Sequence, residues 1–118
     1  MIKIVAPIKP VPFKRPDSNG KRRYDKGYYR EFKELLGWIA KKAMGERKPL
    51  TGAISAQITI HKKRRGILKS QWGDIDNFVK AVFDALNGIC FEDDAQVKRL
   101  TAEKFYGSPK VSICLEEI

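Results

Sequence analysis

The sequence has little of what disulfide-linked, zinc-binding or membrane-spanning proteins require. Its 118 residues include two cysteines and one histidine, and Cys90 and Cys114 are not in a Cys-x-x-Cys arrangement. This scarcity argues against a zinc site and favours reduced thiols over a disulfide. No apolar run approaches the ~20 residues that a bilayer span needs, and the first residues lack the apolar core of a signal peptide. We therefore expect a cytoplasmic protein without membrane contact.

Acidic residues are also few, and their distribution is uneven. The chain has 24 Lys and Arg against 14 Asp and Glu, a formal net charge of +10 and a pI near 9.8. Residues 1–72 hold 19 basic and 5 acidic residues, whereas residues 73–118 hold 5 and 9. The positive excess predicts a polyanionic partner such as nucleic acid. Because carboxylates repel phosphates, the acidic residues of the second part predict a divalent cation between the two.

Hydrophobic periodicity predicts the element order β-α-β-α-β-β. Alternation of apolar and polar residues predicts strands at residues 2–6, 53–60, 96–106 and 110–116. Apolar residues at three- and four-residue steps predict helices at about residues 28–44 and 74–87. The residues expected on the apolar sides of these helices are Tyr28, Phe32, Leu35, Leu36, Ile39, Ala40 and Ala43 in the first, and Ile75, Phe78, Val79, Val82, Phe83 and Leu86 in the second.

The segments between these elements are short and basic. Residues 9–27 and 61–73 are rich in Pro, Gly, Lys and Arg, show no period and are expected to be loops. Neither has the length or composition of a domain linker. The pattern predicts a single α+β domain over residues 1–118, with two helices packed on a small mixed sheet.

The start of the second helix carries the densest group of chemically active side chains. Asp74 and Asp76 flank a single isoleucine, and Asp76, Lys80 and Asp84 follow one another at four-residue steps on one side of the helix. One interpretation is structural: Asp74 caps the helix, Asp76 interacts with the helix dipole, and Lys80 pairs with its acidic neighbours.

The other interpretation is a metal site. Carboxylate oxygens are the ligands that Mg²⁺ and Mn²⁺ prefer, and a third carboxylate from the loop 92–94 would complete a pocket if that loop returned toward the helix start. Lys80 could then stabilise charge on a phosphoryl group. The same loop residues could instead form a solvated turn. Composition and spacing thus favour a metal-dependent phosphodiesterase.

One long stretch resembles a known family. The sequence GDIDNFVKAVFDALNGICFEDDAQV, residues 73–97, is similar to the signature of the RusA-type Holliday junction resolvases. The resemblance implies a small homodimeric endonuclease, bacterial or prophage-borne, that uses Mg²⁺ to nick four-way DNA junctions symmetrically. It also implies that Asp74, Asp76 and Asp94 are the catalytic, metal-binding carboxylates and that Lys80 is essential. The spacing leaves Asp93 open as the third ligand in place of Asp94.

Further residues are expected to serve binding. Candidate phosphate contacts lie in the two basic segments: Lys14, Arg15, Arg22, Arg23, Lys62, Lys63, Arg64, Arg65 and Lys69. Asn77 is expected to orient a ligand or a bound water. Phe13 could enter a junction crossover or tether its loop, and Trp72 could pack the helix start or stack on a base. The alternatives to a junction resolvase are a non-catalytic nucleic-acid-binding module and a nuclease for flaps or forks.

Overall fold

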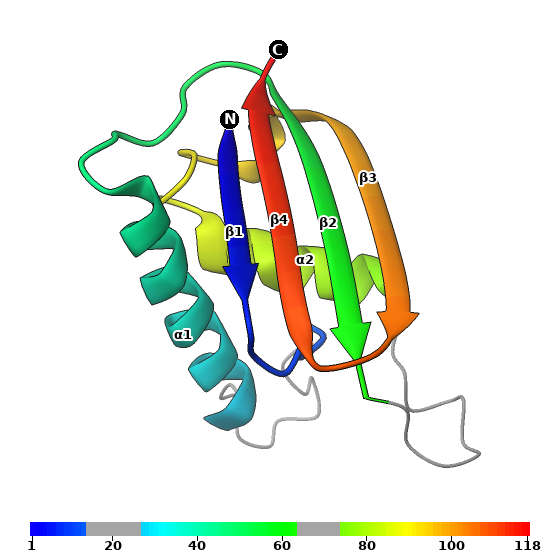
Figure 1. Ribbon diagram of the computed structural model, residues 1–118. Helices are drawn as coiled ribbons and strands as arrows, with labels where there is room; N and C mark the ends of the chain where they lie inside the picture. The colour runs from blue at the N-terminus through cyan, green and yellow to red at the C-terminus, as the bar shows by residue number, and fades with distance from the viewer. Residues whose placement is uncertain (14–26, 64–73) are drawn as a thin grey trace, which may run out of the picture.

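The computed structural model describes residues 1–13, 27–63 and 74–118, and within them it confirms the predicted order of elements (Figure 1). The strands are β1 (Ile2–Ala6), β2 (Ile54–Lys62), β3 (Val97–Tyr106) and β4 (Lys110–Glu117). The helices are α1 (Gly27–Met44), α2 (Ile75–Leu86) and the short 3₁₀ helix η2 (Asp94–Gln96). No helix in the described part of the chain is long and apolar enough to cross a membrane.

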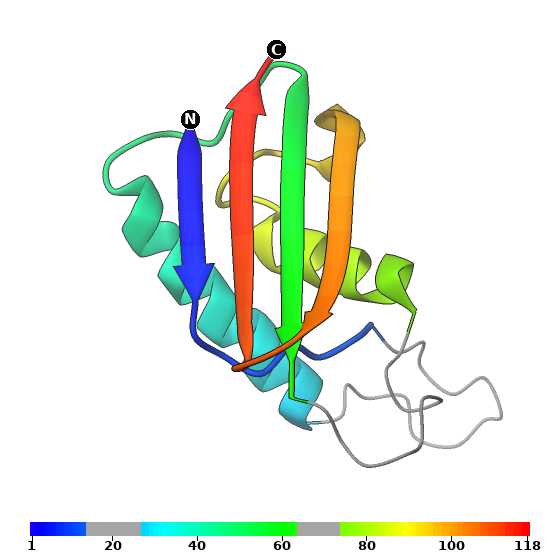
Figure 2. The ribbon, with the colours of Figure 1, turned by 45° about the vertical axis from the view of Figure 1, so that its right-hand side comes forward.

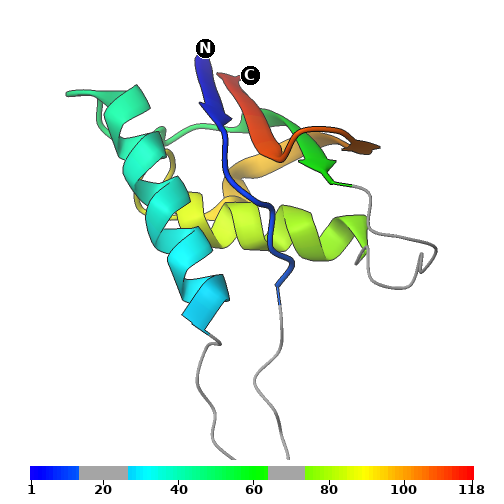
Figure 3. The same cartoon turned by 60° about the horizontal axis from the view of Figure 1, so that its bottom comes forward.

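The four strands form one mixed sheet in the order β1-β4-β2-β3. β4 is antiparallel to both of its neighbours, whereas β2 and β3 are parallel. Strands β1, β2 and β3 therefore run in the same direction, and they finish at one end of the sheet, which we call the carboxyl end. They begin at the other end, the amino end. Both helices lie on one face of the sheet (Figures 1 and 3).

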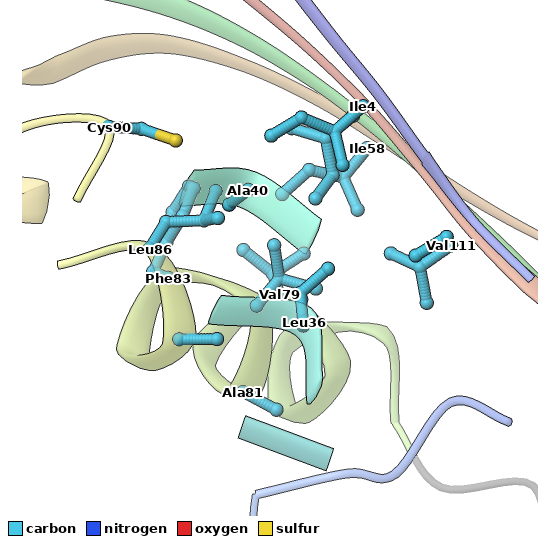
Figure 4. Packing of buried hydrophobic residues seen from close by; sticks show 14 of the residues in the cluster. Ile4, Leu36, Ala40, Ile58, Val79, Ala81, Phe83, Leu86, Cys90 and Val111 are labelled. Atoms are coloured by element: carbon cyan, nitrogen blue, oxygen red, sulfur yellow. The ribbon is translucent and has the colours of Figure 1, made fainter. Parts of the chain in front are cut away.

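The core lies between this face and the helices. Strand residues alternate between buried and accessible, as in β1, where Ile2, Ile4 and Ala6 are buried and the residues between them are exposed. From the helices, Leu36, Ala40, Val79 and other apolar side chains point at the same layer (Figure 4). Each fully buried side chain of this size contributes about 1.5–3 kcal/mol, so packing rather than helix propensity fixes the helices on the sheet.

The structure corrects two details of the predicted elements. Tyr28 and Leu35 are 52% and 48% exposed, and Tyr29 is buried instead, because α1 is rotated so that Tyr29, Phe32, Leu36, Ala40 and Met44 form its inner stripe. In addition, β2 continues through residues 61 and 62, which were expected to begin a loop, because both still pair with β3.

The two cysteines are free thiols, as predicted. Cys90 is fully buried, and burial raises its pKa to about 11, although the positive charge of Arg47 acts in the opposite direction. The thiol is therefore protonated and unreactive at neutral pH.

Candidate metal and nucleic-acid site

The first turn of α2 presents two carboxylates that make no side-chain hydrogen bond within the described residues. Asp74 occupies the N-cap position with an extended backbone, and its carbonyl accepts bonds from the Asn77 and Phe78 amides, but its side chain makes no capping hydrogen bond. Asp74 and Asp76 are both exposed. The structural interpretation of Asp74 as a side-chain cap is therefore wrong, and both carboxylates are free to bind a ligand.

Lys80 is positioned by an aromatic ring. Its Nζ lies 4.1 Å from the centroid of the Phe13 ring, within cation–π distance. Phe13 is itself fixed, because its amide donates to the Asn77 carbonyl (2.9 Å) and its ring packs edge-on against Tyr29 at 5.9 Å. Phe13 thus tethers the chain after β1 to the first turn of α2, which favours the tether over the wedge among its predicted roles.

Asp84 has a different partner from the one expected. The Tyr29 hydroxyl donates to Asp84 Oδ2 at 2.9 Å, and this bond links α1 to α2. With Lys80 over Phe13 and Asp84 bonded to Tyr29, the expected pairing of Lys80 with acidic neighbours is not found within the described residues. Among the described residues, the Lys80 ammonium therefore has no carboxylate partner.

The second acidic pair, Asp93 and Asp94, lies at the start of η2, and the Asp93 side chain stabilises this turn. Asp93 Oδ2 accepts a bond from the Ala95 amide at 3.2 Å, and Gln96 Oε1 accepts from the Asp93 amide at 3.0 Å, which together form a capping box. The amide nitrogen of Gln96 then donates to the Leu50 and Gly52 carbonyls at 2.8 and 3.0 Å. The half-buried Asp94 shows no side-chain partner in the described ranges.

These two acidic pairs lie at opposite ends of the molecule. α2 begins beside the carboxyl end of β2, where Lys62 Nζ is 5.6 Å from the Phe78 ring centroid. η2 lies at the amino end, directly before β3 (Figure 2). Accordingly, the described residues contain no group of three or more Asp, Glu, His or Cys side chains that could hold a metal ion.

The expected return of the acidic loop to the helix start is therefore wrong within one chain. The reason is the parallel pairing of β2 with β3, because a crossover between parallel strands leaves from one end of the sheet and re-enters at the other. Asp74 follows the end of β2, and Asp94 precedes the start of β3. The metal-binding roles of these residues remain predictions.

The predicted DNA contacts are only partly described. Lys62 closes β2 and Lys63 follows it, exposed, at the carboxyl end. Residues 14–26 and 64–73, with the other predicted contacts and Trp72, lie outside the described residues. The first segment lies between the chain after β1 and the start of α1, and the second lies between the end of β2 and the start of α2. These flanking elements all lie at the carboxyl end (Figure 3).

Three contributors to this arrangement were not predicted from the sequence. Gln96 organises η2, and the Tyr29 hydroxyl bonds to Asp84 across the two helices. The Phe13 ring positions Lys80. Only Gln96 had a local signal, since a Glu or Gln three residues after an N-cap completes a capping box. Asn77 is half-buried, and its carbonyl rather than its side chain makes the observed bond to Phe13.

Comparison with known proteins identifies the class to which this arrangement belongs. Residues 7–116 match the model of a family of nucleases described as endodeoxyribonuclease RusA. The chain belongs to this family, and the resemblance drawn from residues 73–97 is confirmed. A curated relative, uncharacterized protein YqaN of Bacillus subtilis (strain 168), is 30% identical over 138 aligned positions, which cover 99% of this chain and 96% of that protein.

Proposed function

We propose that the protein is a magnesium-dependent endodeoxyribonuclease that resolves Holliday junctions by paired symmetric nicks in DNA recombination and repair. The observation that supports this most strongly is the first turn of α2 in a RusA-family chain. There, within the described residues, Asp74 and Asp76 are exposed without a side-chain hydrogen bond, and Lys80 lies over the Phe13 ring without a carboxylate partner. The described elements before and after both basic segments lie at the same end of the molecule.

The donor set fits the proposed ion, with Mn²⁺ as a substitute. Asp74, Asp76 and Asp94 offer carboxylate oxygens, which suit hard divalent cations. A bound Mg²⁺ would polarise the scissile phosphate and lower the pKa of an attacking water. The Lys80 ammonium, held by Phe13, stabilises the negative charge that develops on the phosphoryl oxygens. The basic residues of the two segments hold the DNA backbone, with no need for base recognition.

We further propose that the working unit is a homodimer in which each metal site takes residues from both subunits. One chain keeps Asp94 away from Asp74 and Asp76, as the crossover between β2 and β3 requires. A second chain can supply the missing carboxylate. Two such sites related by a two-fold axis also match the approximate two-fold symmetry of a four-way junction, which needs two cuts. Asp94 is the proposed third ligand because the Asp93 carboxylate is already engaged in η2.

Substrate and metal dependence are tested with a synthetic immobile four-way junction, a fork, a flap, a linear duplex and a single strand. Cleavage of the junction should exceed that of the other substrates, stop in EDTA and resume with excess Mg²⁺ or Mn²⁺. Full cleavage in EDTA would exclude the metal, and equal cleavage of flaps would make the enzyme a general branched-DNA nuclease. Binding without any cleavage would indicate the non-catalytic module.

The shared site is tested by mixing inactive variants. In an Asp74→Asn and Asp94→Asn heterodimer, both changes fall in the same composite site and the other site is intact. After subunit exchange at equal concentrations, about a quarter of wild-type nicking should return, because half of the dimers keep one of two sites. A mixture of Asp74→Asn with Asp76→Asn is the matched control, since each site then loses one ligand and no activity returns. Equal failure of both mixtures would place each site within one chain.

A further inference from the structure

Lys80 has two acidic neighbours at helical spacing, Asp76 four residues before it and Asp84 four residues after it. Opposite charges at this spacing attract one another, and an ammonium that is paired with a carboxylate is less available to a phosphate. Asp76 belongs to the proposed metal site, where a bound cation would engage its carboxylate. Asp84 is not a proposed ligand, so it is the acidic partner left for Lys80.

The Tyr29 hydroxyl engages this remaining carboxylate. It donates to Asp84 Oδ2 at 2.9 Å, from a side chain that is only 3% exposed. A hydrogen bond from a buried hydroxyl to a carboxylate is strong, because the acceptor is charged and water competes less for the donor. Asp84 is half-buried and has no other side-chain partner in the described ranges. The bond therefore directs the Asp84 carboxylate toward α1.

The same tyrosine supports the contact that Lys80 makes instead. The Tyr29 ring lies edge-on to the Phe13 ring, with 5.9 Å between the centroids, and the Lys80 Nζ lies 4.1 Å from the Phe13 centroid. One residue of α1 thus acts on two alternative partners of Lys80. Its ring supports the aromatic partner, and its hydroxyl holds the acidic partner.

We propose that Tyr29 is a positioning residue for Lys80, because its hydroxyl withholds Asp84 and so keeps the Lys80 ammonium on the Phe13 ring, available to the scissile phosphate. The effect on cleavage rests on the proposed function, whereas the competition for Lys80 is a property of the free protein. Loss of the hydroxyl releases Asp84. A cation–π contact and an ion pair at four-residue spacing are similar in strength at an exposed site, so Lys80 then divides between the two partners.

The competition is measured by NMR on the free protein with isotope-labelled lysine. Protons above the face of an aromatic ring are shielded, so the Lys80 ε-methylene signal should lie upfield of the signals of lysines without a ring contact. Lys80→Arg identifies the signal by its loss. Tyr29→Phe keeps the ring and removes only the hydroxyl, and it should move the signal downfield. Addition of Asp84→Asn removes the competing charge and should return the signal to its wild-type position.

Lys33 provides an internal control in the same spectra. Its Nζ lies 4.7 Å from the centroid of the Tyr29 ring, and Tyr29→Phe retains that ring face. The Lys33 signal, identified with Lys33→Arg, should therefore stay in place while the Lys80 signal moves. A Lys80 signal that does not move in Tyr29→Phe would overturn the proposal. Failure of Asp84→Asn to return it would do the same.

Nicking is measured with the same variants under single-turnover conditions. Tyr29→Phe should be about threefold slower than wild type, since Lys80 spends part of its time on Asp84. The double variant with Asp84→Asn should recover the wild-type rate. Tyr28→Phe is the matched control, because it removes an exposed hydroxyl from the adjacent residue of α1, and it should keep the wild-type rate. Equally slow nicking in the single and double variants would overturn the proposal, because a purely structural effect of the lost bond is not rescued by removal of the second partner.

The two measurements separate this inference from the proposed function. The expected NMR changes in a protein that cleaves no junction would leave Tyr29 as the residue that withholds Asp84 and would refute the nuclease. Junction cleavage by a protein whose Lys80 signal and nicking rate do not respond to Tyr29→Phe would overturn the inference and leave the nuclease standing.

Discussion

The two ends of the sheet carry similar residues and use them differently. At the carboxyl end, Asp74 sits at the N-cap of α2 but makes no capping bond, and Lys80 rests on a ring rather than on a carboxylate. At the amino end, Asp93 caps η2, and Gln96 fastens it to the chain before β2. A cap position alone therefore does not show whether an aspartate stabilises the fold. The hydrogen bonds of its side chain show whether it does so.

The difference separates side chains that hold the fold from side chains that are available to a ligand. Losing a bonded cap costs about 0.5–2 kcal/mol of stability, whereas an unbonded exposed aspartate contributes little to folding. An asparagine can replace a capping aspartate with small loss, but it cannot replace the negative charge of a metal ligand. Substitutions at the two ends should therefore move stability and activity independently.

The largest expected effect is at the carboxyl end. Asp74→Asn and Asp76→Asn should each lower the single-turnover rate of junction cleavage roughly a hundredfold or more, because each removes a charged ligand from the proposed metal ion. The melting temperature should stay within about 2 °C of wild type, since neither side chain makes a bond in the fold. Junction binding should persist or tighten. Full activity of Asp74→Asn would exclude Asp74 as a required metal ligand.

The second comparison is between neighbours at the amino end. Asp94→Asn should lower cleavage about as much as Asp74→Asn, with unchanged stability, if Asp94 is the third ligand. Asp93→Asn should keep most of the activity, because asparagine still caps η2 and the ligand remains. The measurement is the cleavage rate over a Mg²⁺ titration for both variants. The reverse order of effects would assign the ligand to Asp93.

The third expected effect concerns the group that positions Lys80. Lys80→Ala should abolish nicking and retain junction binding, since one of 24 basic residues adds little to affinity. Phe13→Leu keeps an apolar tether but removes the π face, and it should lower the nicking rate about tenfold with unchanged junction affinity. Phe13→Tyr is the conservative control and should keep the wild-type nicking rate. An equal loss of nicking rate in Phe13→Leu and Phe13→Tyr would show that the ring acts only through packing.

Much of this fold was predictable because its patterns are local. The period-two alternation of β1 and β2 and the apolar stripe of α2 each lie within a dozen residues, and the structure confirms all three, except that Ile75 of the predicted stripe is only half-buried. The first helix was predicted with a wrong inner edge. Tyr28 and Tyr29 are equally apolar, and only the packing of α1 against β1 and α2 decides which is buried.

The site was less predictable, because its geometry depends on topology. Asp94 was expected near Asp74 if the loop 92–94 returned to the helix start, but the parallel pairing of β2 with β3 separates the two residues. That pairing is a long-range property, and no residue near either aspartate encodes it. The contact of Phe13 with Lys80 is likewise formed between segments that are far apart in the sequence.

A smaller effect is expected for the positive charges at the two ends. Lys63 follows β2 at the carboxyl end, and Lys48 lies before β2 at the amino end, and both are exposed. If DNA lies across the carboxyl end, Lys63→Ala should reduce the slope of log affinity against log salt by about 0.9, which corresponds to one phosphate contact. Lys48→Ala should leave the slope unchanged. Equal reductions would mean that the DNA footprint is not confined to one end.

The smallest expected effect is a local loosening at the amino end, for which Cys90 is a reporter. The Cys90 carbonyl accepts a bond from the Leu50 amide at 2.8 Å, and the Leu50 carbonyl is held by Gln96, so the thiol is shielded by the structure that Asp93 caps.

In a Cys114→Ser background, Asp93→Ala should speed alkylation of Cys90 about fivefold, the equivalent of about 1 kcal/mol of lost cap. Asp74→Ala should leave the alkylation rate unchanged, because Asp74 makes no capping bond.

The titration of the Cys90 thiol gives a second check on the same end of the sheet. The pKa of Cys90 rises from 9.0 to about 11 on burial, so its contribution to stability is complete below pH 9 and is lost as the pH rises toward 11. Cys90→Ala should remove that part of the alkaline destabilisation. Equal acceleration of Cys90 alkylation by Asp74→Ala and Asp93→Ala would contradict the distinction between Asp93, whose side chain caps a helix, and Asp74, whose side chain does not.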